Sequence, residues 1–128
     1  LNSKLSMALK KDIALDYKAT VPPKLKVTDL DLCVILGNLI DNAKKMGDYL
    51  IAELRKLPNI KEVRGRGLMI GIELFEDAAP LRKKLIYDEH IFVGSSGNKN
   101  VFRLLPALNI TQAHADQLLT SLRKLLTV

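Results

Sequence analysis

Residues 30–57 read LDLCVILGNLIDNAKKMGDYLIAELRKL, and this stretch decides how the rest of the chain is organised. Its apolar residues recur at alternating steps of three and four, which predicts one long amphipathic helix. We expect Thr28 or Asp29 to cap the start of this helix and Pro58 to end it. At 1.5 Å per residue the helix would be about 40 Å long. The apolar stripe consists of Leu32, Leu36, Leu39, Ala43, Met46, Leu50, Leu54 and Leu57.

Length, charge and cysteine content favour one domain over residues 1–128. The net charge is +6, but the basic residues are scattered among acidic ones and aromatic residues are few, so we do not expect nucleic-acid binding. Cys33 lies on the apolar side of the predicted helix, where we expect a buried thiol. We see no signal peptide and no apolar run long enough for a bilayer, so we expect a cytoplasmic protein that does not enter a membrane.

Shorter segments precede and follow the long helix. Residues 1–11 predict a helix, and residues 13–21 predict a strand that ends at Pro22-Pro23. The predicted fold class is α+β, a two-layer sandwich in which the long helix and the C-terminal helix cover one face of a mostly antiparallel sheet. We expect strand 13–21 to join that sheet or to lie at its edge. After Pro58, strands are predicted at 60–66, 68–75, 90–94 and 101–105, and helices at 78–89 and 111–126.

The sequence ILGNLIDNA at residues 35–43 resembles the N-box of the histidine-kinase-like ATPase domain of sensor kinases. The resemblance covers residues 1–43, whose predicted elements follow that family's order. It implies that Asn38 and Asn42, four residues apart on one helix face, would hold Mg²⁺ and nucleotide phosphates, with Lys45 as a phosphate-binding cation. The family's glycine-rich boxes and lid do not follow in this sequence. We therefore expect no ATP or Mg²⁺ binding; the alternative is that both asparagines are solvated helix residues.

The sequence from residue 42 onward resembles the small C-terminal domain of the acetylornithine aminotransferase family, class III enzymes that depend on pyridoxal phosphate. The segments RGRGLMIGIEL, HIFVGSSGNKN and FRLLPALNIT follow that family's order and spacing. The resemblance implies that Arg103, within FRLLPAL, is the arginine that binds the substrate α-carboxylate. A planar guanidinium suits this role because it grips a carboxylate through two parallel hydrogen bonds. One departure is Ala107, where the family usually has a second proline.

Catalytic groups of the aminotransferase family belong to its large domain: the lysine that forms the Schiff base, the phosphate cup and the aspartate that pairs with the pyridine nitrogen. We therefore expect no catalytic residue, no bound pyridoxal phosphate and no enzyme activity. No metal site is expected either, because His90 and His114 lie far apart in the sequence and lack a metal-ligand spacing.

We interpret the chain as a recombined or designed chimera without catalytic function. In this reading a kinase-like segment, residues 1–43, joins an aminotransferase-like segment, residues 44–128, in the middle of one helix. The alternative is a fragment of a pyridoxal-phosphate-dependent aminotransferase that retains substrate-carboxylate or cofactor binding. A third hypothesis is a module that forms a homodimer through leftover apolar surface.

Overall fold

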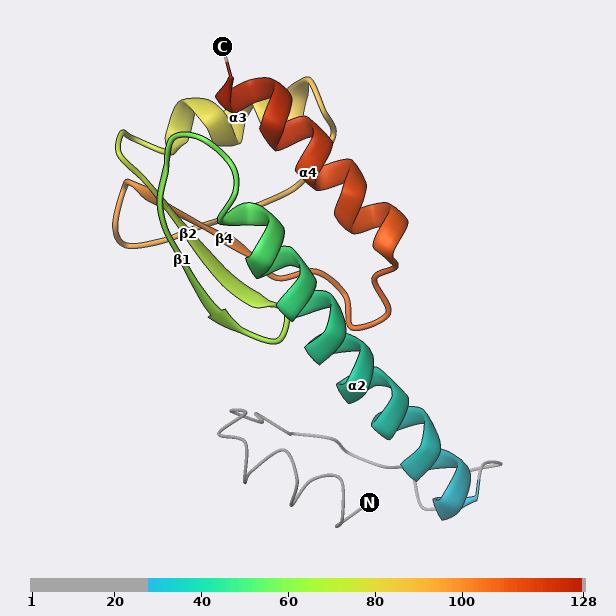
Figure 1. Cartoon of the computed structure of the whole chain (residues 1–128). Helices are drawn as coiled ribbons and strands as arrows, with labels where there is room; N and C mark the ends of the chain where they lie inside the picture. Colours follow the sequence, from blue (N-terminus) through green and yellow to red (C-terminus); the bar gives the residue numbers. More distant parts are fainter. Residues whose placement is uncertain (1–27, 128) are drawn as a thin grey trace. The chain divides into compact units, whose positions relative to one another are not determined.

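A computed structural model describes residues 28–127, so the helix expected at 1–11 and the strand expected at 13–21 lie outside the described residues. Figure 1 shows the described elements in chain order. They are α2 (Asp29–Leu54), β1 (Ile60–Arg66), β2 (Met69–Leu74), α3 (Ala79–Tyr87), β3 (Gly94–Ser95), β4 (Val101–Leu104) and α4 (Gln112–Leu126).

The chain divides into two compact units, Leu1–Asp41 and Asn42–Val128, and the boundary falls within α2. The described part of the first unit is the beginning of that helix. Thr28 caps it, because its Oγ1 accepts a hydrogen bond from the Asp31 backbone N–H at 3.2 Å. Apolar side chains in this part are exposed: Leu30 by 74%, Val34 by 54% and Ile35 by 50%.

Helix α2 is continuous through Asn42, as the stripe predicted, but it ends at Leu54 rather than Leu57. Leu57 N–H bonds Leu54 O at 3.1 Å, which tightens the chain into a final short turn. Pro58 then prevents further helix, and Asn59 reverses the chain with a φ of 62°. Leu57 fits the spacing of the apolar stripe because its side chain is buried, although the residue lies outside the helix.

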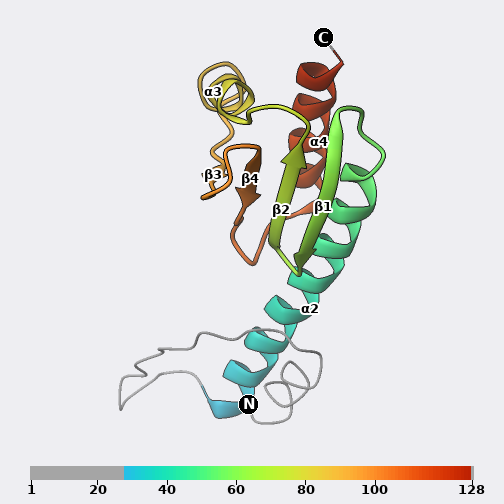
Figure 2. The same cartoon turned by 90° about the vertical axis from the view of Figure 1, so that its left-hand side faces the viewer.

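The second unit is a two-layer α+β structure, which confirms the predicted fold class. Its four strands follow the order β1-β2-β4-β3, and every neighbouring pair is antiparallel. Figure 2 shows the C-terminal half of α2 and all of α4 on one face of this sheet, and no helix of residues 28–127 covers the opposite face, called the open face below. The core lies between these layers and contains Leu50, Leu54, Val63, Ile70, Ile72, Phe102, Leu104, Ala115, Leu119 and Leu122, among other residues.

Strand β3 is shorter than predicted, and the expected strand 90–94 is wrong over its first four residues. His90 has a φ of 57°, a left-handed conformation that does not fit a strand. Ile91 N–H instead bonds Leu85 O at 2.8 Å, which holds this segment against the last turn of α3. Helix α3 ends at Tyr87, and pairing with β4 begins only at Gly94.

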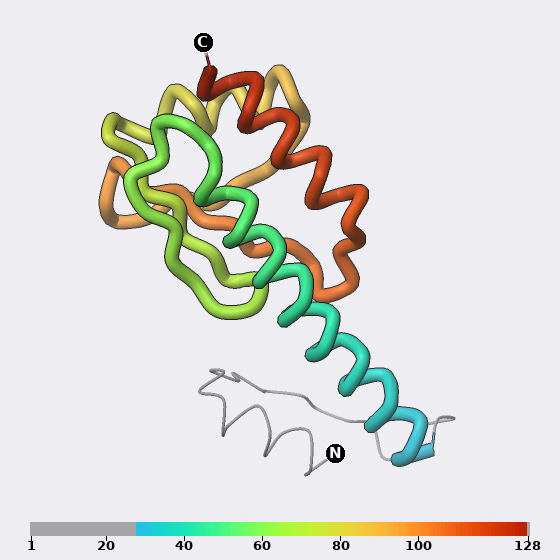
Figure 3. Tube along the Cα trace, in the orientation of Figure 1, coloured from blue at the N-terminus to red at the C-terminus, as the bar shows by residue number. Residues whose placement is uncertain are grey.

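Helix α2 touches the β1–β2 turn through two glycines. A Cβ built on Gly47 would lie 2.0 Å from Gly67 O and 2.8 Å from Gly67 Cα, so the two backbones meet without side chains between them. Gly67 also has a φ of 54°, which side chains rarely tolerate. Figure 3 shows the backbone of α2 passing beside the turn between β1 and β2. Gly47 therefore sets how closely the helix approaches the hairpin.

Glu89 joins the segment after α3 to α4. Its carboxylate accepts hydrogen bonds from Ser121 Oγ at 2.9 Å and from Lys124 Nζ at 2.6 Å. The Lys124 bond, followed by the Ser121 bond, lowers the pKa of Glu89 below its ordinary value of 4.5. The ionised form is therefore the one that stabilises the fold.

Replacing Gly47 with alanine should destabilise the chain by about 1–3 kcal/mol, because the added methyl group overlaps the Gly67 backbone. Helix propensity alone would predict the opposite, a gain of about 1 kcal/mol. Urea unfolding of Gly47→Ala checks this, and Ala52→Gly, at an exposed position of the same helix, measures the propensity term. A stabilised Gly47→Ala variant would contradict the close approach.

The stabilising effect of Glu89 should depend on pH. Because the folded-state pKa is lowered, the effect is complete above the unfolded pKa near 4.5 and is lost as pH falls through the folded value. Glu89→Gln should therefore lower the melting temperature at pH 7, and the difference from wild type should shrink below pH 4.5. Glu76→Gln, at an exposed position, is the control. A difference that does not change with pH would show that the carboxylate charge is irrelevant.

Candidate functional site

Arg103 lies in a row of residues that crosses the open face of the sheet. In the strand register Arg103 of β4 pairs with Gly71 of β2 on one side and with Gly94 of β3 on the other. Gly71 in turn pairs with Arg64 of β1. Because side chains alternate along a strand, the buried Phe102 points to the core and Arg103 to the open face. Arg103 is thus exposed between two positions that have no side chain.

The guanidinium of Arg103 is anchored at one end. Its Nε donates a hydrogen bond to the Ser95 backbone oxygen at 2.7 Å. Within residues 28–127 the structure shows no hydrogen-bond partner for the two terminal nitrogens of this side chain. In general, the two terminal nitrogens of a guanidinium can hold a carboxylate through two parallel hydrogen bonds.

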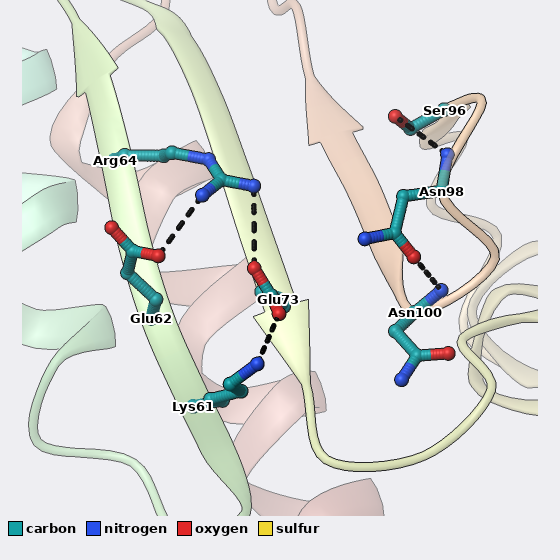
Figure 4. A network of polar contacts seen from close by, with 7 residues as sticks. All are labelled: Lys61, Glu62, Arg64, Glu73, Ser96, Asn98 and Asn100. Carbon is teal, nitrogen blue, oxygen red and sulfur yellow. Dashed lines mark hydrogen bonds and ion pairs between the residues drawn. The ribbon is translucent and has the colours of Figure 1, made fainter.

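The other charged side chains on β1 and β2 largely satisfy one another, as Figure 4 shows. Glu73 accepts bonds from Lys61 Nζ at 2.6 Å and from Arg64 Nη2 at 3.2 Å, and Arg64 Nη1 bonds Glu62 at 2.9 Å. The bond from Lys61 is the main cause of the lowered pKa of Glu73. Two cations and two anions balance here. Arg103 does not take part in this network, which leaves its charge available to a ligand.

Local hydrogen bonds order the segment between β3 and β4. Asn98 N–H bonds Ser96 Oγ at 3.4 Å, and Asn100 N–H bonds Asn98 Oδ1 at 3.0 Å, as Figure 4 also shows. The Asn100 carbonyl then accepts the Leu74 N–H at 2.9 Å, which ties the turn to the end of β2. These local bonds are typical of Asx and Ser turns, and they fix the polar sequence GSSGNKN as a structured turn.

The three residues implied by the kinase resemblance have different surroundings. Asn42 is half-buried, and its Nδ2 donates to Leu108 O at 2.6 Å and to Ile110 O at 3.1 Å. It therefore holds the segment before α4 and is not a solvated helix residue, so for Asn42 that alternative is wrong. Asn38 and Lys45 are exposed, with Asn38 in the first unit and Lys45 in the second. The expectation that they bind no nucleotide stays a prediction.

Comparisons with known proteins agree with the resemblance from residue 42 onward. The family Aminotransferase class-III matches residues 29–126. The chain belongs to the class-III aminotransferases.

Relatives of this class-III aminotransferase chain include ornithine aminotransferase from Staphylococcus carnosus, which is 40% identical over 88 residues, covering 67% of this chain and 22% of the relative. Ornithine aminotransferase from Toxoplasma gondii is 29% identical with a TM-score of 0.61, over 73% of this chain and 24% of that one. N-acetylornithine aminotransferase from Stenotrophomonas maltophilia is 26% identical with a TM-score of 0.57, over 69% and 26%. The chain thus spans about a quarter of its relatives or less.

The family match begins at residue 29 and so runs through the N-box-like residues 35–43. Nothing in these comparisons shows a sensor-kinase segment or a chimera. Among the described residues no helix is both long and apolar enough to cross a membrane. In the same residues no group of three or more His, Cys, Asp or Glu side chains could hold a metal ion.

The family implies pyridoxal phosphate, and the described residues do not fit this cofactor by themselves. A surface hollow of about 330 Å³ lies near α3 and the end of α4, with Lys84 on its wall. Glu76 and Asp77 also line it, so a phosphate placed beside Lys84 would face two carboxylates. Arg103 does not line the hollow. This hollow therefore does not bring a lysine together with Arg103.

Replacing Asn42 with alanine should lower the free energy of unfolding by about 1–3 kcal/mol, because the Leu108 and Ile110 carbonyls lose their donor. Asn38→Ala, in the same helix at an exposed position, should change it by less than about 0.5 kcal/mol. Urea unfolding of both variants makes the comparison. Equal effects would show that the Asn42 bonds contribute nothing.

Proposed function

We propose that this chain is the substrate-carboxylate-binding segment of a pyridoxal-phosphate-dependent aminotransferase that acts on ornithine or acetylornithine. Arg103 binds the α-carboxylate that both amino acids carry. The observation that supports this is the anchored guanidinium: Nε donates to Ser95 O, and the terminal nitrogens have no hydrogen-bond partner among residues 28–127. The names of the relatives supply the substrate class.

Electrostatics favour Arg103 over its neighbours as the carboxylate ligand. The balanced network of Lys61, Glu62, Arg64 and Glu73 has little net attraction for an anion. Arg103 is a cation whose two partners in the strand register, Gly71 and Gly94, have no side chains. A carboxylate there gains two charge-assisted hydrogen bonds and displaces no acidic partner.

The strength of this contact depends on the exclusion of water. An exposed ion pair contributes roughly 0–1 kcal/mol, too little to retain a free amino acid. Two exposed apolar residues lie close to Arg103 along these strands. Met69 precedes Gly71 by two residues in β2 and is 64% exposed, and Leu105 follows β4 directly and is 58% exposed. A protein surface that covers this apolar border would also dry the arginine. The site therefore needs the rest of the enzyme.

Catalysis itself lies beyond what the described residues provide. Pyridoxal phosphate supplies the electron sink for amino-group transfer when it is bound in a complete enzyme. Arg103 only holds and orients the substrate, so the isolated chain should be inactive. The chimera with a sensor-kinase segment in residues 1–43 remains a finer hypothesis, supported by the resemblance of residues 35–43 alone. The cytoplasmic location and a homodimer through apolar surface also stay predictions.

Two preparations test the proposal. The isolated chain, incubated with pyridoxal phosphate, ornithine and 2-oxoglutarate, should transfer no amino group and show no lasting aldimine absorbance after dialysis. The second preparation is a hybrid of the Staphylococcus carnosus ornithine aminotransferase in which residues 29–126 of this chain replace the matching segment. We expect this hybrid to be active. In that hybrid Arg103→Ala should lower kcat/KM for ornithine by about 10- to 100-fold, the effect of losing a charged bidentate contact.

The matched control changes the substrate. 1,4-Diaminobutane has the same chain of atoms as ornithine without the carboxylate, so Arg103→Ala should leave its kcat/KM unchanged. Equal losses for both amines would contradict carboxylate binding by Arg103. Turnover by the isolated chain, abolished by one lysine substitution, would show that a catalytic site is present within it.

A further inference from the structure

Asn42 uses both N–H groups of its side-chain amide on the segment that follows Arg103. Its Nδ2 donates to Leu108 O at 2.6 Å and to Ile110 O at 3.1 Å. A primary amide has two N–H donors, so neither is left for another partner. Asn42 belongs to α2, and the two carbonyls lie between β4 and α4, so these bonds join distant parts of the chain within the second unit.

Residues 105–110 have little else to hold them. None of these residues is buried, and Leu105 is exposed by 58%. In the described part of the chain, the segment makes one hydrogen bond besides the two from Asn42, from Ile110 N–H to Ala107 O at 3.1 Å. A segment with few buried contacts opens at a low cost in free energy. We therefore expect its order to depend on Asn42.

Arg103 lies close to this segment along the chain. It is the third of the four residues of β4, and Leu104, the last, pairs with Ile70 of β2. The ends of strands fray first, so disorder in residues 105–110 would reach the C-terminal end of β4 before the rest of the sheet. A functional side chain must be held to within about 0.5 Å of its productive position. Order just after β4 is therefore a condition for a two-bond contact by Arg103.

We propose that Asn42 is a positioning residue of the Arg103 site: by holding Leu108 O and Ile110 O, its amide fixes residues 105–110 and with them the end of β4 that carries Arg103. The carboxylate part rests on the proposed function. The ordering part concerns this chain alone and is measurable without a ligand.

The first test measures the order of the Leu105 backbone amide by ¹⁵N relaxation in the full chain. In wild type its order parameter should be about 0.85, the value of a rigid backbone, and in Asn42→Ala it should fall below about 0.6. Ile72, buried in β2, should keep its value in both chains, which shows that the variant is folded. Asn38→Ala, at an exposed position of the same helix, is the control and should leave Leu105 unchanged.

Two results would overturn the ordering part. One is a wild-type order parameter of Leu105 below about 0.6, a comparison that needs no variant to fold. The other is a folded Asn42→Ala chain in which Leu105 is as rigid as in wild type.

The second test uses the hybrid enzyme and asks whether the ordering acts through Arg103. Asn42→Ala should lower kcat/KM for ornithine about 3- to 10-fold, because a displaced guanidinium binds the carboxylate less well. It should leave kcat/KM for 1,4-diaminobutane unchanged. In an Arg103→Ala background the same change should have no further effect, because the group through which Asn42 acts is then absent.

Equal losses with both amines in Asn42→Ala would show that Asn42 supports only the fold, and the positioning role would be wrong. A failure of the proposed function gives a different result, in which Arg103→Ala itself lowers kcat/KM equally for both amines. The relaxation of Leu105 decides the ordering part in either case.

Discussion

The backbone contact between Gly47 and Gly67 is the constraint on which the second unit depends. With no side chain between them, α2 lies directly against the β1–β2 turn. This contact fixes how close α2 lies to the sheet, and so it fixes where Leu50 and Leu54 pack in the core, in which both are fully buried. Asn42, five residues earlier, then holds the segment that leads into α4. One close approach thus places both helices on the sheet.

Strand β4 shows how four residues serve the core and the site together. Phe102 and Leu104 face the helices and are buried, while Arg103 between them faces the open side. Period-two alternation makes this arrangement strict, since a shift by one residue would bury the arginine and expose the phenylalanine. The core that fixes the register of β4 therefore also fixes the row in which Arg103 lies. The stability of the fold and the proposed role of Arg103 thus depend on the same strand register.

The sequence predicted what depends on local pattern. The three-four stripe predicted α2 and the limits of β1 were correct, whereas the role that the class-III resemblance implies for Arg103 stays a prediction. What it missed depends on distant partners or on backbone conformation. The hydrogen bonds of Asn42 reach residues 66 and 68 positions away, and no local pattern records such a pairing. The positive φ of His90 was equally hidden, because histidine is not a residue that signals a left-handed turn as glycine does.

The glycines of this chain carry information that the spacing of its apolar residues does not. A glycine within a strand or helix costs stability, so each one raises the question of what occupies the space of its missing side chain. For Gly47 the answer is another backbone, whereas a Cβ at Gly94 would make only ordinary contacts, with Arg103 O at 3.5 Å and with Arg103 Cβ at 3.7 Å. Packing therefore requires the first glycine and leaves room for a methyl group at the second. Distinguishing the two needs the distances, because the residue letter is the same.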